Sequence, residues 1–448
     1  MNASSAVFHR QSRSIPRTAV GGTGLYLIDQ DGRRYLDASG GAAVSCLGHG
    51  NAAIRQAIRR QADSLAYAHT AFFTTEPAEE LGRRLCAGAG EAFSHVYFVS
   101  GGSEANETAM KLCRQYHCER GETARSHFIA RRQSYHGNTL GALALSGNPA
   151  RRTLYAPMLI DVSHVEPCFA YRYQRAGEDD SDYAARAAAD LEREILAIGP
   201  DKVAAFFAET VVGATAGAVP PVADYFRHIR AICDRYGILL VLDEVMAGMG
   251  RTGSLFAFHQ EGIVPDLVTC AKGLGGGYQP VGAVIVKDAV YQVIAAGSGF
   301  FQNGFTYNGH AIACAAGNAV LTQIEERGLI EHSRRLGMVL TERLRHAFGQ
   351  HPHVGDIRGR GLFVGLEFVA DRGTKSTFDP SRQFARALRM AGLENGLICY
   401  PGSGTVDGAR GDHVLIAPPF IIDEGGIDEL VEKLARSLDQ ALATTANQ

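Results

Sequence analysis

Six short apolar runs recur between residues 95 and 286, and this rhythm constrains the fold more than any other feature of the chain. They are HVYFVS (95–100), HFIA (127–130), VAAFFAE (203–209), GILLVLDE (237–244), DLVTCA (266–271) and VGAVIV (281–286). Amphipathic helical patterns lie between several of them, the clearest from Ala223 to Tyr236, before Gly237. Continuous apolar strands that alternate with helices are typical of a mostly parallel sheet covered on both faces. The sequence therefore predicts an α/β fold.

The two ends of the chain follow a different pattern. Residues 25–37 predict a β-hairpin around the turn dipeptide Asp31-Gly32. Beyond residue 325 we expect a helix over 330–348, a short glycine-rich β element, a second helix, the strand HVLIAPPFII and a last helix from Ile427. We expect a smaller α+β domain that also receives the N-terminal segment. The predicted boundaries are 1–66 for that segment, 67–325 for the large domain and 326–448 for the small one.

Charge and cysteine usage exclude several classes of protein. Lys and Arg total 44 against 47 for Asp and Glu, a net charge of -3, so nothing in the charge favours nucleic acid or an anionic membrane as partner. No apolar run approaches the roughly 18 residues of a membrane span. The nine cysteines include no C-x-x-C pair. We therefore expect neither a disulfide framework nor a metal site, and a cytoplasmic location.

Polar residues follow five of the predicted strands. One strand ends in Ser100-Gly101-Gly102-Ser103, the next is followed by Ser134-Tyr135-His136-Gly137, and three more end in Glu209, Asp243 and Lys272. In an open α/β sheet, ligands bind outside the carboxyl ends of the strands. The sequence therefore predicts one site assembled from five strand ends.

Lys272 is the most informative of these residues. Lysine is rarely buried, and this one follows an apolar strand and precedes Gly-Leu-Gly-Gly-Gly. A lysine with a lowered pKa forms a Schiff base with an aldehyde cofactor, and the glycines would let the backbone approach that cofactor closely. The alternative is a solvated lysine that opens a loop.

Asp243 ends the most hydrophobic strand and needs a charged partner or several hydrogen bonds. A protonated pyridinium nitrogen is one such partner, and a helix N-cap or loop aspartate is the alternative. Val245, two residues on, would pack under the ring, although valine near a strand end is usually a core residue. Together with Lys272, these residues predict pyridoxal 5'-phosphate as the cofactor.

Three further residues or segments fit the same cofactor. A glycine turn that runs into a helix N-terminus, with Gly102 and Ser103, suits a phosphate, although such turns also cap ordinary helices. Tyr135 is placed to stack on a flat ring, or it is a core aromatic. Glu209 hydrogen-bonds near the ring oxygen, pairs with an arginine, or is a plain loop acid.

The segments SGGSEANETAMK, SYHG, AETVVGATAG, VLDEVMAGMGRTG, CAKGLGGGYQPVGAV and FTYNGHAIACAA closely resemble the class III (omega) aminotransferases, of the type I pyridoxal-phosphate fold. The resemblance covers nearly the whole chain. It implies a homodimer with active sites at the subunit interface. It also implies that Gly102 and Ser103 hold the phosphate, and that Thr306 reaches the phosphate from the other subunit.

The resemblance implies amino transfer by a ping-pong mechanism, from an amine or omega-amino acid to a keto acid such as pyruvate or 2-oxoglutarate. Lys272, once displaced by the donor, acts as the general base. Arg410 lies where relatives often carry a carboxylate-binding arginine; we expect it there, paired with Glu209 when no carboxylate is bound, or as a surface loop residue. Racemases, aminomutases and decarboxylases of the same fold share Lys272 and Asp243 and stay open as alternatives.

Overall fold

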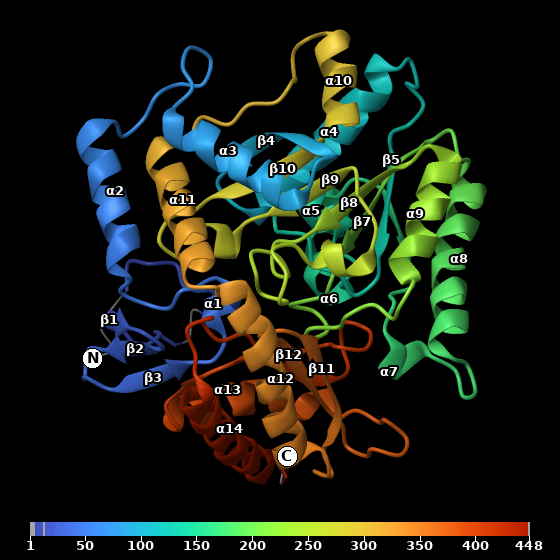
Figure 1. The fold of residues 1–448 in the computed structure, drawn as a ribbon. Helices are drawn as coiled ribbons and strands as arrows, with labels where there is room; N and C mark the ends of the chain where they lie inside the picture. The colour runs from blue at the N-terminus through green and yellow to red at the C-terminus, as the bar shows by residue number, and fades with distance from the viewer. Residues whose placement is uncertain (1–4, 12–13, 447–448) are drawn as a thin grey trace.

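The computed structural model describes residues 5–11 and 14–446, and a seven-stranded sheet forms its centre (Figure 1). The strand order is β4-β10-β9-β8-β7-β5-β6. The strands span β4 Phe93–Val99, β5 His127–Arg131, β6 Val162–Val165, β7 Val203–Glu209, β8 Leu239–Asp243, β9 Leu267–Cys270 and β10 Gly282–Lys287. Only β10 runs antiparallel to its neighbours, so the predicted mostly parallel sheet is confirmed. The sequence patterns missed β6, a short strand at the edge.

Helices cover both faces of this sheet, because successive strand side chains point to opposite sides. On one face, Phe206 and Leu240 pack with α3 (Glu76–Ala89), α8 (Asp180–Ile198) and α9 (Tyr225–Tyr236). On the other, Phe207 and Val241 pack with α4 (Gly102–Glu119), α5 (Leu140–Leu145) and α10 (Asp288–Ala296). The helix predicted from Ala223 is thus α9, which ends at Gly237 in the left-handed conformation that glycine favours.

The two ends of the chain lie together below the central sheet in Figure 1, in blue and red. The predicted hairpin is β2 (Tyr26–Asp29) and β3 (Arg34–Asp37), in a four-stranded sheet with β1 (Ala19–Thr23) and β13 (Leu397–Ile398). A second sheet joins β11 (Val354–Arg360), β12 (Phe363–Phe368), β15 (Asp412–Ile416) and β14 (Tyr400–Ser403). These sheets share a core with α12 (Leu329–Phe348), α13 (Phe384–Glu394) and α14 (Glu424–Thr445), as an α+β unit requires. The residue boundaries given above stay a prediction.

Three further α-helices are α1 (Gly40–Ala43), α6 (Pro149–Arg152) and α11 (Ala311–Glu326). The remaining helices are α2 (Ala52–Ser64) and α7 (Ala170–Tyr173). Within the described part of the chain, every helix is too short or too polar to cross a bilayer.

Candidate active site

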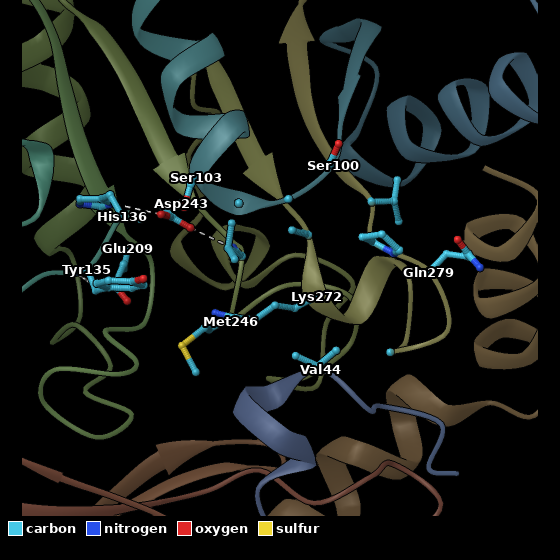
Figure 2. Close-up of a pocket in the computed structure, with 18 of the residues that line it drawn as sticks. Val44, Ser100, Ser103, Tyr135, His136, Glu209, Asp243, Met246, Lys272 and Gln279 are labelled. Atoms are coloured by element: carbon cyan, nitrogen blue, oxygen red, sulfur yellow. Dashed lines mark hydrogen bonds and ion pairs between the residues drawn. The ribbon is translucent and has the colours of Figure 1, made fainter. Parts of the chain in front are cut away.

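The carboxyl ends of the parallel strands open into a cavity of about 380 Å³, within the usual range for small-molecule sites. Its wall contains all five of the predicted strand ends (Figure 2). Lining residues from these ends are Ser100, Gly101, Gly102, Ser103, Tyr135, His136, Gly137, Glu209, Asp243, Val245 and Lys272. Val44, just after α1, closes it from the side of the N-terminal segment. The predicted convergence at one edge of the sheet is therefore confirmed.

Lys272 follows β9 directly and sits in a strained backbone conformation. Its φ is 46°, in the left-handed region that a lysine rarely adopts. Such strain persists only where the surroundings impose it, and it concentrates at functional sites. Burial lowers the pKa of the Lys272 amine, although Asp243 and Glu209 act against that shift and Arg151 adds to it. A lowered pKa increases the fraction of neutral amine, the form that reacts with an aldehyde or takes up a proton.

The Asp243 carboxylate is held by three hydrogen-bond donors. Oδ2 accepts from Nδ2 of Asn106 (2.8 Å) and lies 2.9 Å from Nδ1 of His136. Oδ1 accepts from the backbone N–H of Val245 (2.9 Å). All these contacts are buried or half-buried, where charge-assisted hydrogen bonds are strongest. They fix the carboxylate at the cavity wall, so that it can face a cationic ring nitrogen.

The sequence patterns missed the part played by Asn106. This side chain is fully buried on α4, and its amide also donates to the His136 carbonyl (2.7 Å). Its Oδ1 accepts from Oγ1 of Thr269, another buried residue, at 3.0 Å. The sequence does carry a signal for this role, because Asn106 lies among Ala105, Ala109 and Met110 on the apolar face of α4. A polar side chain that is buried there needs hydrogen-bond partners.

The N-terminus of α4 forms the phosphate-sized end of the cavity. Gly101 caps the helix in an extended conformation, so the first N–H groups of α4 have no intrahelical partner. A Cβ on Gly102 would lie 2.8 Å from Cγ1 of Val245, so no larger residue fits this close contact. The Ser103 hydroxyl accepts from the N–H of Asn138 (3.0 Å). This turn offers N–H and O–H donors and a positive helix end to an anion.

Tyr135 and Glu209 lie on the same side of the cavity (Figure 2). One Glu209 oxygen accepts from the N–H of Tyr135 (2.9 Å) and the other from the N–H of Gly213 (2.8 Å). Burial raises the pKa of this carboxyl. Glu209 therefore joins the loop that carries Tyr135 to the loop after β7, and it presents an acidic group to any ligand.

Two sequence-predicted residues do not reach the cavity of their own chain. Arg410 is exposed, and its Nε pairs with Asp407 Oδ2 at 2.7 Å. The predicted pair between Arg410 and Glu209 is not formed, since the two Glu209 oxygens bind backbone N–H groups instead. Thr306 is also exposed, and its carbonyl accepts from the Tyr67 hydroxyl (2.9 Å).

The residues present fit pyridoxal phosphate. The cavity has a lysine amine, a fixed carboxylate, an aromatic side chain and a helix N-terminus around one space of ligand size. Gly102 leaves the phosphate end of that space open where a Cβ would collide with Val245. Among the residues that the structure describes, no three His, Cys, Asp or Glu side chains are grouped to hold a metal ion. The donor set therefore matches an organic phosphate with an aldehyde.

Comparisons with known proteins agree with this chemistry. A family model described as aminotransferase class III matches residues 7–438. An uncharacterized aminotransferase of Schizosaccharomyces pombe is 46% identical over 438 residues, and the match covers 98% of this chain and 95% of that relative. A diaminobutyrate–2-oxoglutarate transaminase of Halomonas elongata is 38% identical, and the match covers 95% of this chain and 90% of that relative.

Solved structures give the same result. The omega transaminase of Pseudomonas jessenii in complex with PMP is 34% identical, has a TM-score of 0.91, and covers 96% of this chain and 94% of its own. An (S)-enantioselective omega-transaminase from Thermomicrobium roseum is 36% identical with a TM-score of 0.90 and the same coverage. The chain thus belongs to the class III aminotransferases, which have the type I fold and use pyridoxal 5'-phosphate.

Proposed function

We propose that this aminotransferase moves an amino group from an amine or omega-amino acid to pyruvate or 2-oxoglutarate. The observation that carries the proposal is the placement of Lys272 and Asp243 in the wall of one cavity, with burial lowering the pKa of the lysine. Relatives named for such donors support it: the diaminobutyrate–2-oxoglutarate transaminase of H. elongata, and a gamma-aminobutyrate transaminase of Solanum lycopersicum that is 36% identical.

When bound, pyridoxal phosphate supplies an electron-withdrawing ring that stabilises the negative charge left on the substrate carbon after a proton departs. Asp243 would pair with the ring nitrogen, and its three hydrogen-bond partners hold the carboxylate in a fixed orientation. Lys272 would hold the cofactor by its aldehyde until the donor replaces it. Its freed amine would then take the proton from the substrate carbon that bears the nitrogen.

The remaining lining residues would position the cofactor. Gly102 and Ser103 would hold the phosphate at the N-terminus of α4, and Val245 would support one face of the ring. Tyr135 would lie against the other face, and Glu209 would stand near the ring oxygen. All of these residues line the cavity, and Ser103, Tyr135 and Glu209 can be followed in Figure 2.

We also propose a homodimer in which Thr306 completes the phosphate site of the partner subunit. The exposure of Thr306, and of several large aromatic side chains in the segments 72–73 and 300–307, supports this assembly. Those aromatics are Phe72, Phe73, Phe300 and Tyr307. We further propose a cytoplasmic location, supported by nine cysteines that are all free thiols.

The test is a panel of amines, omega-amino acids and α-amino acids, each assayed with pyruvate and with 2-oxoglutarate. We expect donor consumption that depends on the keto acid, with stoichiometric formation of alanine or glutamate. Loss of carbon dioxide, racemisation or amino-group migration without a keto acid would contradict the proposal and favour the alternative reactions of the same fold. Size-exclusion chromatography with light scattering tests the dimer separately.

A further inference from the structure

We propose that Arg151, on α6, binds the carboxylate of the substrate and makes the site selective for carboxylate-bearing donors and acceptors. This inference rests on the proposed function, because it names the residue that would select those substrates. It assigns the task to Arg151 instead of Arg410, which the structure places at the surface in an ion pair with Asp407.

The position of Arg151 relative to the cavity carries the inference. Its guanidinium carbon lies 4.7 Å from the centre of the Tyr135 ring, and Tyr135 lines the cavity. A guanidinium stacked on an aromatic face keeps the N–H groups of its edge free for two parallel hydrogen bonds to a carboxylate. Figure 2 shows that Lys272 extends toward the side of the cavity where Tyr135 lies. A substrate with both groups could therefore place its amine near Lys272 and its carboxylate near Arg151.

The half-buried Arg151 side chain also has unused binding capacity. Its guanidinium makes no hydrogen bond and no ion pair with any residue in 5–11 or 14–446, and only its backbone N–H is bonded, to Asn148. By contrast, the guanidinium of Arg152, next in sequence, contacts the His164 ring at 3.3 Å. A guanidinium without a protein acceptor beside a ligand cavity is a ready partner for an anionic ligand.

The charge balance of the cavity calls for such a cation. Glu209 and Asp243 are both acidic and both line the wall, so a substrate carboxylate would enter beside two like charges. Lys272 is the one lysine or arginine among the lining residues, and by the proposed function the cofactor would engage it. After burial, the positive charge of Arg151 also contributes to the lowered pKa of the Lys272 amine.

The helix that carries Arg151 packs against the loop 404–411. Its first residue, Pro149, is packed so closely by the loop 404–411 that a Cβ on Gly408 would lie 2.9 Å from Cδ of Pro149. That loop is fixed to the large domain, because the Gln133 amide donates to the carbonyls of Gly404 (2.8 Å) and Thr405 (3.1 Å). A fixed helix reduces the conformational freedom that Arg151 loses on binding a ligand.

The experiment compares Arg151→Leu and Arg151→Lys with Arg410→Leu and Arg10→Leu, two exposed arginines, of which Arg10 also lies near Tyr135. Two readouts are used on the cofactor-loaded enzyme: KM and kcat for each substrate, and the Kd of propionate measured by calorimetry. Propionate carries a carboxylate and no amine, so its binding requires no turnover. The pair 1-phenylethylamine and benzaldehyde, neither of which carries a carboxylate, serves as the substrate control.

We expect Arg151→Leu to raise the KM for pyruvate and the Kd of propionate by roughly 10- to 100-fold, the usual effect of losing a hydrogen bond to a charged group. Turnover of the carboxylate-free pair should stay within about twofold of wild type. Arg151→Lys should restore part of the affinity, since it keeps the charge and loses the bidentate geometry. Arg410→Leu and Arg10→Leu should bind propionate as wild type does.

Three results would overturn the inference: unchanged propionate binding in Arg151→Leu, an equal loss for substrates with and without a carboxylate, or loss of propionate binding in Arg410→Leu or Arg10→Leu instead. If Arg151→Leu fails to fold, the comparison of Arg151→Lys with wild type decides. A wild-type enzyme that binds propionate through Arg151 but transfers no amino group would contradict the proposed function and leave this inference standing.

Discussion

The carboxylate of Asp243 and the imidazole of His136 form a buried contact, with Oδ2 of the aspartate 2.9 Å from Nδ1 of the histidine. His136 is fully buried, and its Nε2 has no partner among the described residues. With a proton on Nδ1, the imidazole would donate this hydrogen bond to the Asp243 carboxylate. The pair links the SYHG loop after β5 to the end of β8, two strands away.

Replacing Lys272 by alanine should abolish amino transfer, because no other amine lines the cavity described here. The absorption band of the bound cofactor should shift to that of free aldehyde. Borohydride followed by peptide mapping should attach the cofactor to Lys272 in wild type alone. A variant that turns over at a rate near wild type would refute the assignment.

Asn106→Ala should reduce kcat/KM by roughly 10- to 100-fold, because the buried Asp243 loses one charged hydrogen bond worth about 1.5–3 kcal/mol. Thr269→Val serves as a milder substitution in the same hydrogen-bond network. It removes only the neutral hydrogen bond to Asn106, worth about 1 kcal/mol, so its effect should be near fivefold. Steady-state kinetics and the cofactor spectrum of both variants check that Asn106→Ala has the larger effect. Equal effects of the two substitutions would show that Asn106 does not act through Asp243.

Gly102→Ala should weaken cofactor binding at least tenfold, since the new Cβ would lie 2.8 Å from Val245 and push the phosphate turn away. Gly82→Ala, within α3, is the matched control. Its Cβ would meet only a Phe98 carbon at 3.9 Å, an ordinary contact. Titration of apoenzyme with pyridoxal phosphate measures both affinities. Wild-type affinity in Gly102→Ala would argue against phosphate binding at this turn.

The His413 imidazole should make the fold sensitive to acid. Burial lowers its pKa from an ordinary 6.5 to about 3, and Arg358 and Arg151 add to that shift. The unfolded chain therefore takes up the proton first as pH falls. The free energy of unfolding therefore carries no penalty from His413 above pH 6.5. As pH falls from 6.5 toward 3, it decreases by about 1.4 kcal/mol per pH unit.

His413→Gln removes this titrating group while keeping a side chain that can hydrogen-bond to Thr405. Urea unfolding at several pH values between 8 and 4 should give a flatter pH dependence for the variant than for wild type. If the free energy of unfolding of the two proteins depended on pH in the same way, His413 would not be the group responsible.

Much of the site was predictable because it follows from local sequence. Lys272, Asp243 and Glu209 each end an apolar strand, and parallel strands bring such ends to one edge of a sheet. Asn106 and His136 were in segments already singled out, yet their role depends on which side chains meet across α4, β5 and β8. The strand β6 was missed because four residues at a sheet edge carry little periodicity.

By itself, the sequence determined the alternation of strands and helices around the central sheet except for β6, the family and the cofactor chemistry, because hydrophobic periodicity and short motifs are local properties of the chain. Only the tertiary structure decided which arginine lies beside the cavity. Arg410 and Arg151 are 259 positions apart, yet both belong to segments that meet where the loop 404–411 packs on α6. Arg151 lies over Tyr135, whereas Arg410 is exposed to solvent. This difference depends on long-range packing, which no spacing in the sequence encodes.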